Sequence, residues 1–353
     1  MFTDSLLKDL RNAVPLAEDY KEITIPKKGG GLRKISIPNP ELMNIQKKIL
    51  RFLNGSMTEK DWLVKKGRHD FISFSMIKVY YYSFPAHAWL HADSRFIFQF
   101  DIKDAFPSVN SQMVHETVRD LLKSSSLGNA EKEELADLIT ALTVYKGVLP
   151  QGAPTSPILF FLLVIRGGLF ETLSCLLQNE SYRWHRWLQP NLPGKSQWKI
   201  SFYFDNFVIS GDQPLPDDLK EMIFKNVRDF GFKINEKKTW QADCREGVPL
   251  VTGLRVDGIK KRVSLPKRTI RKWRAIIHKA TSNPTPESRL MIEGFIASTR
   301  PIYRGKLPMQ ILKPLILFRQ ACPPPEQKPI KKSNKTKRLI LVPKKIIQTR
   351  LIS

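Results

Sequence analysis

Two short apolar strands in this sequence each end on an acidic residue, and this pairing constrains the fold more than any other feature. The first strand runs from Phe98 to Asp101, and the second runs from Ile200 to Asp205 and Asn206. Burying a carboxylate beside a hydrophobic strand is costly unless a positive charge lies next to it. A bound divalent cation supplies such a charge. Two aspartates on neighbouring strands therefore indicate a two-metal centre for phosphoryl transfer.

The composition points to a polyanionic partner. The chain has 353 residues, 42% of them hydrophobic, and a net charge of +25. Such a charge favours nucleic acid first and an anionic membrane second. The longest apolar run, Ile158 to Ile165, is too short to span a bilayer, so no membrane partner is expected. The first residues include acids and lack the order of a signal peptide, and the three widely spaced cysteines support neither a disulfide framework nor a zinc site. We expect a cytoplasmic protein.

The order of patterns along the chain predicts an α+β protein. Glycines 29–31 separate two alternating runs within residues 22–38, which predicts a β-hairpin. We expect a helix from Ser111 capped by Asn110 or Ser111, and a strand pair formed by 232–234 and 250–256. Helices are also predicted over 1–20, with Val14 on the buried face, and over 40–53, 158–170, 217–230, 267–280 and 287–299.

Each acidic strand also has a simpler interpretation. Asp205-Asn206 could form a tight turn, because both residues tolerate the left-handed conformation. Alternation places Phe202 and Phe204 on one face and Asp205 on the other, at a hairpin tip. Asp101 could be an ordinary strand end. Either strand alone is weak evidence.

A third segment makes the pattern specific. Residues 149–157 read Leu-Pro-Gln-Gly-Ala-Pro-Thr-Ser-Pro and precede an apolar helix. Gly152 and Ala153 let a flat base pair approach the backbone, and the prolines stiffen the loop. A simple helix-entry loop is the alternative for this segment taken by itself.

In this order, Phe-Asp-Ile-Lys-Asp-Ala-Phe (100–106), Pro-Gln-Gly-Ala-Pro-Thr-Ser-Pro (150–157) and Tyr-Phe-Asp-Asn (203–206) resemble prokaryotic reverse transcriptases, most closely the retron and related defence-associated groups. The resemblance covers about residues 20–306. It implies a right-hand polymerase with fingers, a ferredoxin-like palm, a helical thumb and, here, a basic C-terminal tail. The expected divisions are an N-terminal helix (1–20), fingers and palm (21–245), thumb (246–320) and tail (321–353).

The resemblance also implies roles for individual residues. Asp101, Asp205 and the Ile102 carbonyl would hold Mg²⁺, or Mn²⁺. Lys238 would assist departure of pyrophosphate. The incoming nucleotide would contact Lys27 and Arg33 at its triphosphate, Phe106 under its sugar, and Gln151 and Gly152. The thumb helix would track the nucleic-acid backbone with Lys267, Arg268, Arg271, Lys272 and Arg274.

Two short strings favour the retron branch. Val251-Thr252-Gly253 resembles the element at the start of the retron thumb. Residues 87–91 resemble an Asn-Ala-x-x-His element, with His87 in the Asn place. For His91 we expect a hydrogen-bonded core histidine.

The chain departs from the family at Asn206, where the pattern normally has a second aspartate. This change removes a negative charge beside the expected metals, which predicts weaker metal binding and transition-state stabilisation. Asn206 keeps a carbonyl oxygen that could coordinate or hydrogen bond, so we retain it among the candidate catalytic residues.

The expected function is RNA-directed DNA synthesis from dNTPs. By resemblance, it would use a dedicated non-coding RNA, form its cDNA product and act with an effector protein in antiviral defence. Two alternatives remain. One is a weakened polymerase fold serving as an RNA-binding scaffold, which Asn206 supports. The other is a template-independent or RNA-synthesising polymerase.

Overall fold

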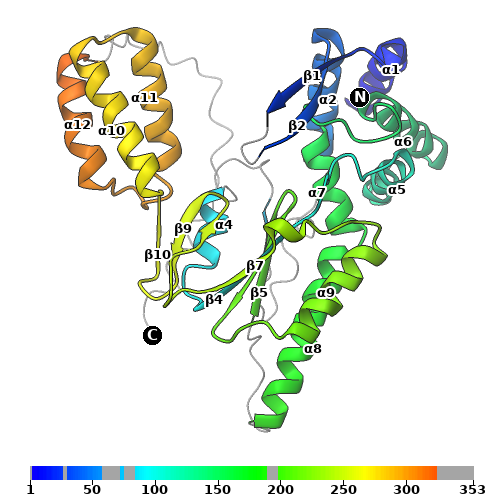
Figure 1. Ribbon diagram of the computed structural model, residues 1–353. Coiled ribbons are helices and arrows are strands. Elements are labelled where there is room, and N and C mark those ends of the chain that lie inside the picture. The colour runs from blue at the N-terminus through cyan, green and yellow to red at the C-terminus, as the bar shows by residue number, and fades with distance from the viewer. Residues whose placement is uncertain (1, 27–29, 58–71, 75–83, 189–197, 324–353) are drawn as a thin grey trace. The chain divides into compact units, whose positions relative to one another are not determined.

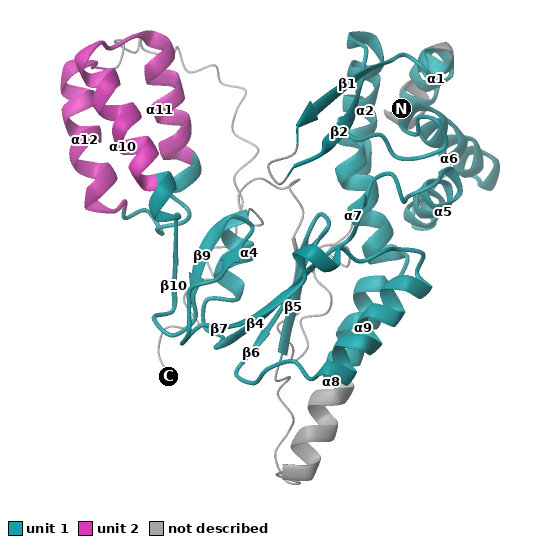
Figure 2. Cartoon of the chain, in the orientation of Figure 1, with its two compact units in different colours: residues 1–269, 298–306 teal, residues 270–297, 307–353 magenta. Residues whose placement is uncertain are grey.

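The computed structural model describes residues 2–26, 30–57, 72–74, 84–188 and 198–323. The chain divides into two compact units (Figure 2). The first comprises Met1–Thr269 and Ser298–Lys306, and the second comprises Ile270–Ala297 and Leu307–Ser353.

A five-stranded sheet forms the centre of the first unit (Figure 1). Its order is β3 (Ile72–Phe74), β5 (Trp198–Tyr203), β6 (Asn206–Gly211), β4 (Phe96–Asp101) and β7 (Trp240–Asp243). β3 is parallel to β5, and the other neighbours are antiparallel. In this register Asn206 lies opposite both Asp101 on β4 and Tyr203 on β5. Asp101 and the turn that holds Asp205 therefore lie at the same end of these central strands.

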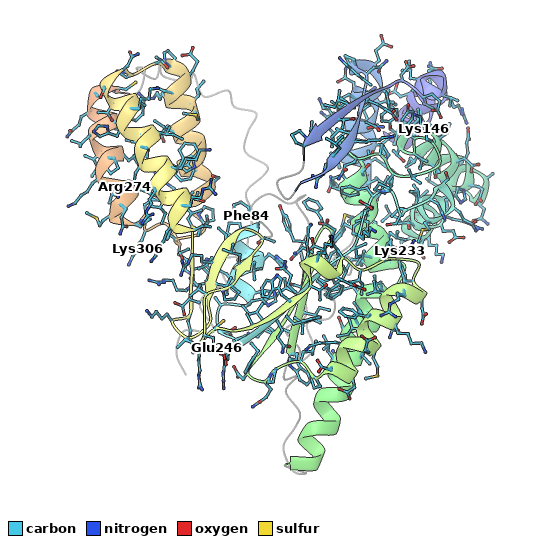
Figure 3. The ribbon with its side chains drawn as sticks, in the orientation of Figure 1. Phe84, Lys146, Lys233, Glu246, Arg274 and Lys306 are labelled. Carbon is cyan, nitrogen blue, oxygen red and sulfur yellow. The ribbon has the colours of Figure 1, made fainter. Side chains whose placement is uncertain are left out.

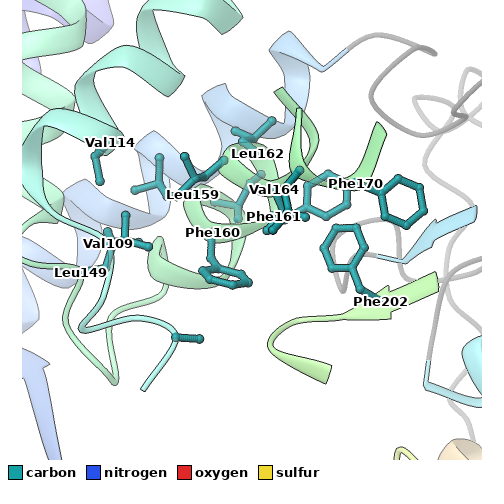
Figure 4. Close-up of a cluster of buried hydrophobic side chains, with 14 of the residues drawn as sticks. Val109, Val114, Leu149, Leu159, Phe160, Phe161, Leu162, Val164, Phe170 and Phe202 are labelled. Atoms are coloured by element: carbon teal, nitrogen blue, oxygen red, sulfur yellow. The ribbon is translucent and has the colours of Figure 1, made fainter. Parts of the chain in front are cut away.

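Alternation along these strands separates an apolar face from a polar one. Phe202 packs on Phe161 of α7 (Ser156–Arg166) and Phe170 of α8 (Leu169–Leu188), as Figure 4 shows. Phe98 and Phe100 contact Phe224 of α9 (Asp217–Asp229). These rings bury the helix-covered face of the sheet. Asp101 alternates with Phe100 and so belongs to the opposite face.

Residues 2–143 also contribute a hairpin and several helices to the first unit. They are α1 (Phe2–Ala13), a 3₁₀ turn (Val14–Leu16), β1 (Tyr20–Pro26), β2 (Leu32–Pro38), α2 (Pro40–Ser56), α5 (Ser111–Leu122) and α6 (Asn129–Thr143). The predicted hairpin is confirmed by the β1–β2 pairing. Asn110 caps α5, because its Oδ1 accepts the Met113 N–H at 2.9 Å. Val14 was wrongly predicted to be buried; it is 42% exposed because the chain tightens into the 3₁₀ turn there.

Two predicted elements differ from the structure. The helix expected over 158–170 is interrupted after α7, because Gly168 adopts a φ of +87°, a conformation that ends helices. The predicted strand pair of 232–234 with 250–256 is wrong. Ile234 forms only a bridge with Ile102, while β8 (Leu250–Val251), β9 (Leu254–Asp257) and β10 (Arg262–Ser264) make a separate sheet. A short helix, α4 (Phe84–Leu90), precedes β4.

The second unit is helical. It contains most of α10 (Lys267–Ser282) and α11 (Pro286–Thr299) together with α12 (Met309–Ala321). Trp273 stacks on Phe295 at 3.8 Å between ring centroids, and Arg319 pairs with Glu293 at 2.7 Å. The expected domain divisions at residues 20, 245 and 320 stay predictions.

Within the described ranges, no single helix has both the length and the apolar character to cross a bilayer. One bent pair, Ser156–Arg166 with Leu169–Gln178, passes by length and composition only.

Candidate active site

The two acidic strand ends meet through the backbone. Asp101 ends β4, and the β5–β6 hairpin places Asp205 in its two-residue turn. The Ile102 N–H donates to the Asp205 carbonyl at 2.9 Å, and the Asn235 N–H donates to the Asp101 carbonyl at 2.8 Å. These bonds hold the turn beside the end of β4 independently of the side chains.

The hairpin turn is made differently from the sequence expectation. Neither Asp205 nor Asn206 has a positive φ; Phe204 does, at +56°, and Asn206 already belongs to β6. A two-residue hairpin needs positive φ within its turn, and the observed register puts Phe204 there. The left-handed residue interrupts the alternation, so the Phe204 ring lies 4.7 Å from the Tyr203 ring instead of beside Phe202. Such strain is typical of functional sites.

Asp101 is nearly buried, at 5% exposure, and both of its carboxylate oxygens accept a hydrogen bond. Oδ1 accepts from Asn206 Nδ2 at 2.7 Å, and Oδ2 accepts from Lys238 Nζ at 2.5 Å. This bond to Asp101 raises the pKa of the Lys238 ammonium. Lys238 therefore places a positive charge in direct contact with Asp101.

The environment of Asp205 disfavours the charged form of its carboxyl. Burial raises the pKa of its carboxyl, and the charge of Asp101 raises it further, while Lys238 and Arg33 act in the opposite direction. Arg33 belongs to β2, so the hairpin of β1 and β2 brings a cation to the acids. Its expected companion, Lys27, lies outside the described residues.

The Gln151–Gly152 loop is hydrogen-bonded to β2, the strand that carries Arg33. The Gln151 carbonyl accepts the Ser36 N–H at 2.8 Å. Gly152 has a φ of +126°, and a Cβ there would stand 2.7 Å from Ile35 Cγ2 and 2.8 Å from the Ser36 carbonyl. Glycine is thus required by the close approach of two backbones. Sequence reasoning missed Ile35 and Ser36, which carry no distinguishing motif.

Phe106 is positioned by the core. It follows a turn in which Asp104 has a φ of +48°. Its half-buried ring meets Phe160 of α7 edge to face at 5.8 Å. This contact orients the Phe106 side chain, for which a position under the nucleotide sugar stays a prediction.

His91 is the satisfied core histidine that the sequence led us to expect. Both ring nitrogens lie 2.7 Å from a serine hydroxyl, Nδ1 from Ser210 on β6 and Nε2 from Ser201 on β5. The histidine thus links two strands of the sheet.

The oxygen atoms present suit a hard divalent cation. Within the described ranges, no cluster of three or more His, Cys, Asp or Glu residues could hold a metal. Asp101 and Asp205 nevertheless supply two carboxylates, and Ile102 offers a carbonyl. In the same part of the chain, Asn206 Oδ1 is buried and has no hydrogen-bond donor. Carboxylate and carbonyl oxygens are the ligands that Mg²⁺ prefers.

The predicted basic helix is α10, most of which belongs to the second unit. Lys267, Arg268, Arg271, Lys272 and Arg274 are all exposed on α10. Figure 3 shows the side chain of Arg274 on this helix. A groove of about 660 Å³ runs between α10 and α12 and is lined by Arg271, Arg274, His278, Lys313, Met309 and Leu317, among others.

Comparison with known proteins identifies a family. The family described as reverse transcriptase (RNA-dependent DNA polymerase) matches residues 25–248. The retron Mx65 reverse transcriptase of Myxococcus xanthus is 26% identical over an alignment of 294 residues, and the match covers 79% of this chain and 60% of that protein. The retron Mx162 reverse transcriptase of the same organism is 28% identical over an alignment of 290 residues, and the match covers 75% of this chain and 53% of that protein. The retron Ec86 reverse transcriptase of Escherichia coli is 24% identical over an alignment of 263 residues, and the match covers 73% of this chain and 69% of that protein.

The chain therefore spans little more than half the length of the two Myxococcus relatives. Among solved structures, apo telomerase from Candida Tropicalis is similar with a TM-score of 0.46 and 13% identity, over 86% of this chain and 61% of that one. The family match covers β2, the acidic strands and the Gln151–Gly152 loop. The chain accordingly belongs to the reverse transcriptase (RNA-dependent DNA polymerase) family, with an α+β polymerase fold and retron reverse transcriptases among its relatives.

Proposed function

We propose that this protein is an RNA-directed DNA polymerase that works by two-metal nucleotidyl transfer. The observation that carries the proposal is the placement of Asp101 beside the Asp205 turn, with Arg33 close enough to affect the pKa of Asp205. Acids that bind metal and a cation that binds phosphate are the two requirements of phosphoryl transfer.

The chain's own residues have distinct tasks in this reaction. Bound Mg²⁺ or Mn²⁺ would activate the primer hydroxyl and neutralise charge on the leaving group. Asp101 and Asp205, with the Ile102 carbonyl, would hold the cations. We assign to Lys238 the delivery of a proton to the departing pyrophosphate, and the position of its ammonium beside Asp101 supports this role.

The nucleotide site uses the elements around the acids. Arg33 and Lys27 grip the triphosphate, a role that suits guanidinium and ammonium groups. Gln151 and Gly152 contact the incoming nucleotide, and Phe106 disfavours a 2′-hydroxyl. Each assignment follows from a motif position within the family match.

The partners proposed here follow from the retron relatives. They are an RNA template within a dedicated non-coding RNA, the cDNA product and an effector protein, in cytoplasmic antiviral defence. The basic α10 helix would bind the nucleic-acid backbone. Sequencing RNA that co-purifies with the protein tests this part: a single enriched structured RNA supports it, and bulk cellular RNA contradicts it.

Primer extension tests the activity. We expect RNA-templated incorporation of dNTPs but not NTPs, in Mg²⁺ or Mn²⁺, and its loss in Asp205→Ala. Incorporation without template, or of NTPs, would indicate one of the alternative polymerases. If wild type and Asp205→Ala are equally inactive in every condition, the RNA-binding scaffold suggested by Asn206 replaces the enzyme.

A further inference from the structure

Asn206 stands where a second carboxylate is usual, and its side chain has two unlike ends. The Nδ2 end donates to Asp101 Oδ1 at 2.7 Å. A carboxylate can only accept, so this orientation of the amide is the one that satisfies Asp101. The Oδ1 end is then left buried with no donor from the described residues.

Hydrogen-bond donors and positive charges of the chain itself surround the acid pair. Asp101 receives Asn206 on one oxygen and Lys238 on the other. The positive charges of Arg33 and Lys238 both favour the ionised carboxylate of Asp205. An aspartate at position 206 would replace the Nδ2 donor by a third carboxylate oxygen facing Asp101. Like charges at such a separation repel strongly in a site this buried.

We propose that Asn206 sets the divalent-metal affinity of this site. Its amide nitrogen holds Asp101 in the metal-free protein, and its amide oxygen is the neutral third oxygen ligand for the cation that Asp101 and Asp205 bind. The site thereby exchanges metal affinity for a stable metal-free state. The proposal rests on the proposed function only in taking Asp101 and Asp205 as metal ligands.

The test uses the full chain without nucleic acid, with Mn²⁺ as probe. Free Mn²⁺ is titrated by electron paramagnetic resonance, and thermal unfolding is followed in EDTA and in saturating Mn²⁺. For Asn206→Asp we expect at least tenfold tighter Mn²⁺ binding, a lower Tm in EDTA, and a larger rise in Tm on adding Mn²⁺. Unchanged Mn²⁺ affinity, or an unchanged Tm in EDTA, would overturn the proposal.

Asn206→Leu separates the two ends of the side chain. Leucine has a similar size but neither donor nor acceptor, so we expect weaker Mn²⁺ binding than in wild type. Retention of wild-type affinity would show that Oδ1 is no ligand. Asn226→Asp on α9 is the matched control: Asn226 donates to the Met222 carbonyl at 2.7 Å, so its loss affects Tm but not the response to Mn²⁺.

A further variant keeps this proposal apart from the proposed function. Asp205→Asn removes a carboxylate that the function requires for metal binding. If Mn²⁺ binding survives in Asp205→Asn, the assignment of the metal ligands fails. If it is lost there but unchanged in Asn206→Asp, only the role of Asn206 fails.

Discussion

At the residue scale, single positions in this protein are fixed by close approach more than by propensity. Gly152 is the clearest case, since its Cβ would meet both the side chain of Ile35 and the backbone of Ser36. By contrast, Gly147 has a φ of +79° but open space around it. The two glycines therefore separate the effect of a left-handed backbone from that of a steric clash.

We expect Gly147→Ala to lower the free energy of unfolding by about 1 kcal/mol, from the left-handed conformation alone. Gly152→Ala should lower it by a further 1–3 kcal/mol or so, because the contacts with β2 must shift. Urea unfolding of both variants measures the difference. Equal losses would mean that the Gln151 loop does not pack on β2.

Two fully buried histidines, His87 and His91, should make the folding stability depend on pH. Burial lowers the pKa of His87 to about 3 and that of His91 well below its usual value. The folded protein keeps both rings neutral, whereas the unfolded chain protonates them below its ordinary pKa near 6.5. The stability that they contribute is therefore complete above about pH 6.5 and is lost as the pH falls below it.

For each histidine the loss between pH 7.5 and 5.5 should be about 1.4 kcal/mol. His87→Phe retains an aromatic ring for the stack on Tyr203, which His87 makes at 5.9 Å, and removes one titrating group. Unfolding free energies of wild type and His87→Phe at both pH values give the comparison. The same pH dependence in both proteins would show that His87 is protonated in the fold.

At the element scale, α10 and α12 combine charge with an apolar surface. Their shared groove holds Arg271, Arg274, His278 and Lys313, and α12 exposes Met309 at 54% and Leu317 at 58%. A groove with this lining suits a phosphate backbone that also presents bases or sugars to apolar contact.

Arg271→Glu combined with Arg274→Glu should weaken RNA binding. It should also make the negative slope of log K against log salt less steep by about 1.4 to 1.8, the equivalent of two phosphate contacts. Filter binding at several salt concentrations measures this slope. Lys225→Glu with Arg228→Glu on α9 makes the same charge change outside the groove, and should leave the slope near the wild-type value. An equal effect in both pairs would indicate a response to net charge alone.

At the scale of the whole molecule, the net charge of +25 is distributed unevenly along the sequence. The segment after Pro323 contains one acid, Glu326. Against it stand nine cations: Lys328, Lys331, Lys332, Lys335, Lys337, Arg338, Lys344, Lys345 and Arg350. These residues lie outside the described ranges, so the prediction for them comes from the sequence.

Deleting residues 324–353 should reduce the salt dependence of RNA binding, because a basic tail releases counterions when it binds. Activity on a short primer-template at low salt should change little, since the acid pair belongs to the first unit. Salt titrations of the full-length and shortened proteins test both points. An unchanged slope would show that the tail does not contribute to RNA binding.

Elements with local signals could be predicted from the sequence alone. The hairpin of 22–38, the cap of α5 and the basic helix α10 follow from turn residues, side-chain acceptors and helical periodicity. The order of three motifs also sufficed to select the family, since each motif holds residues that chemistry restricts.

The way in which the acids are held could not be predicted without the folded structure. Phe204 has a positive φ, and the Gln151 loop is bonded to Ser36. Asn206 and Lys238 both donate to Asp101, and Lys238 lies 137 positions from it in the sequence. Sequence patterns report local preference, whereas these contacts depend on strand register and backbone approach. For that reason the acid-tipped strands predicted a metal centre, but only their pairing showed Asn206 donating to Asp101.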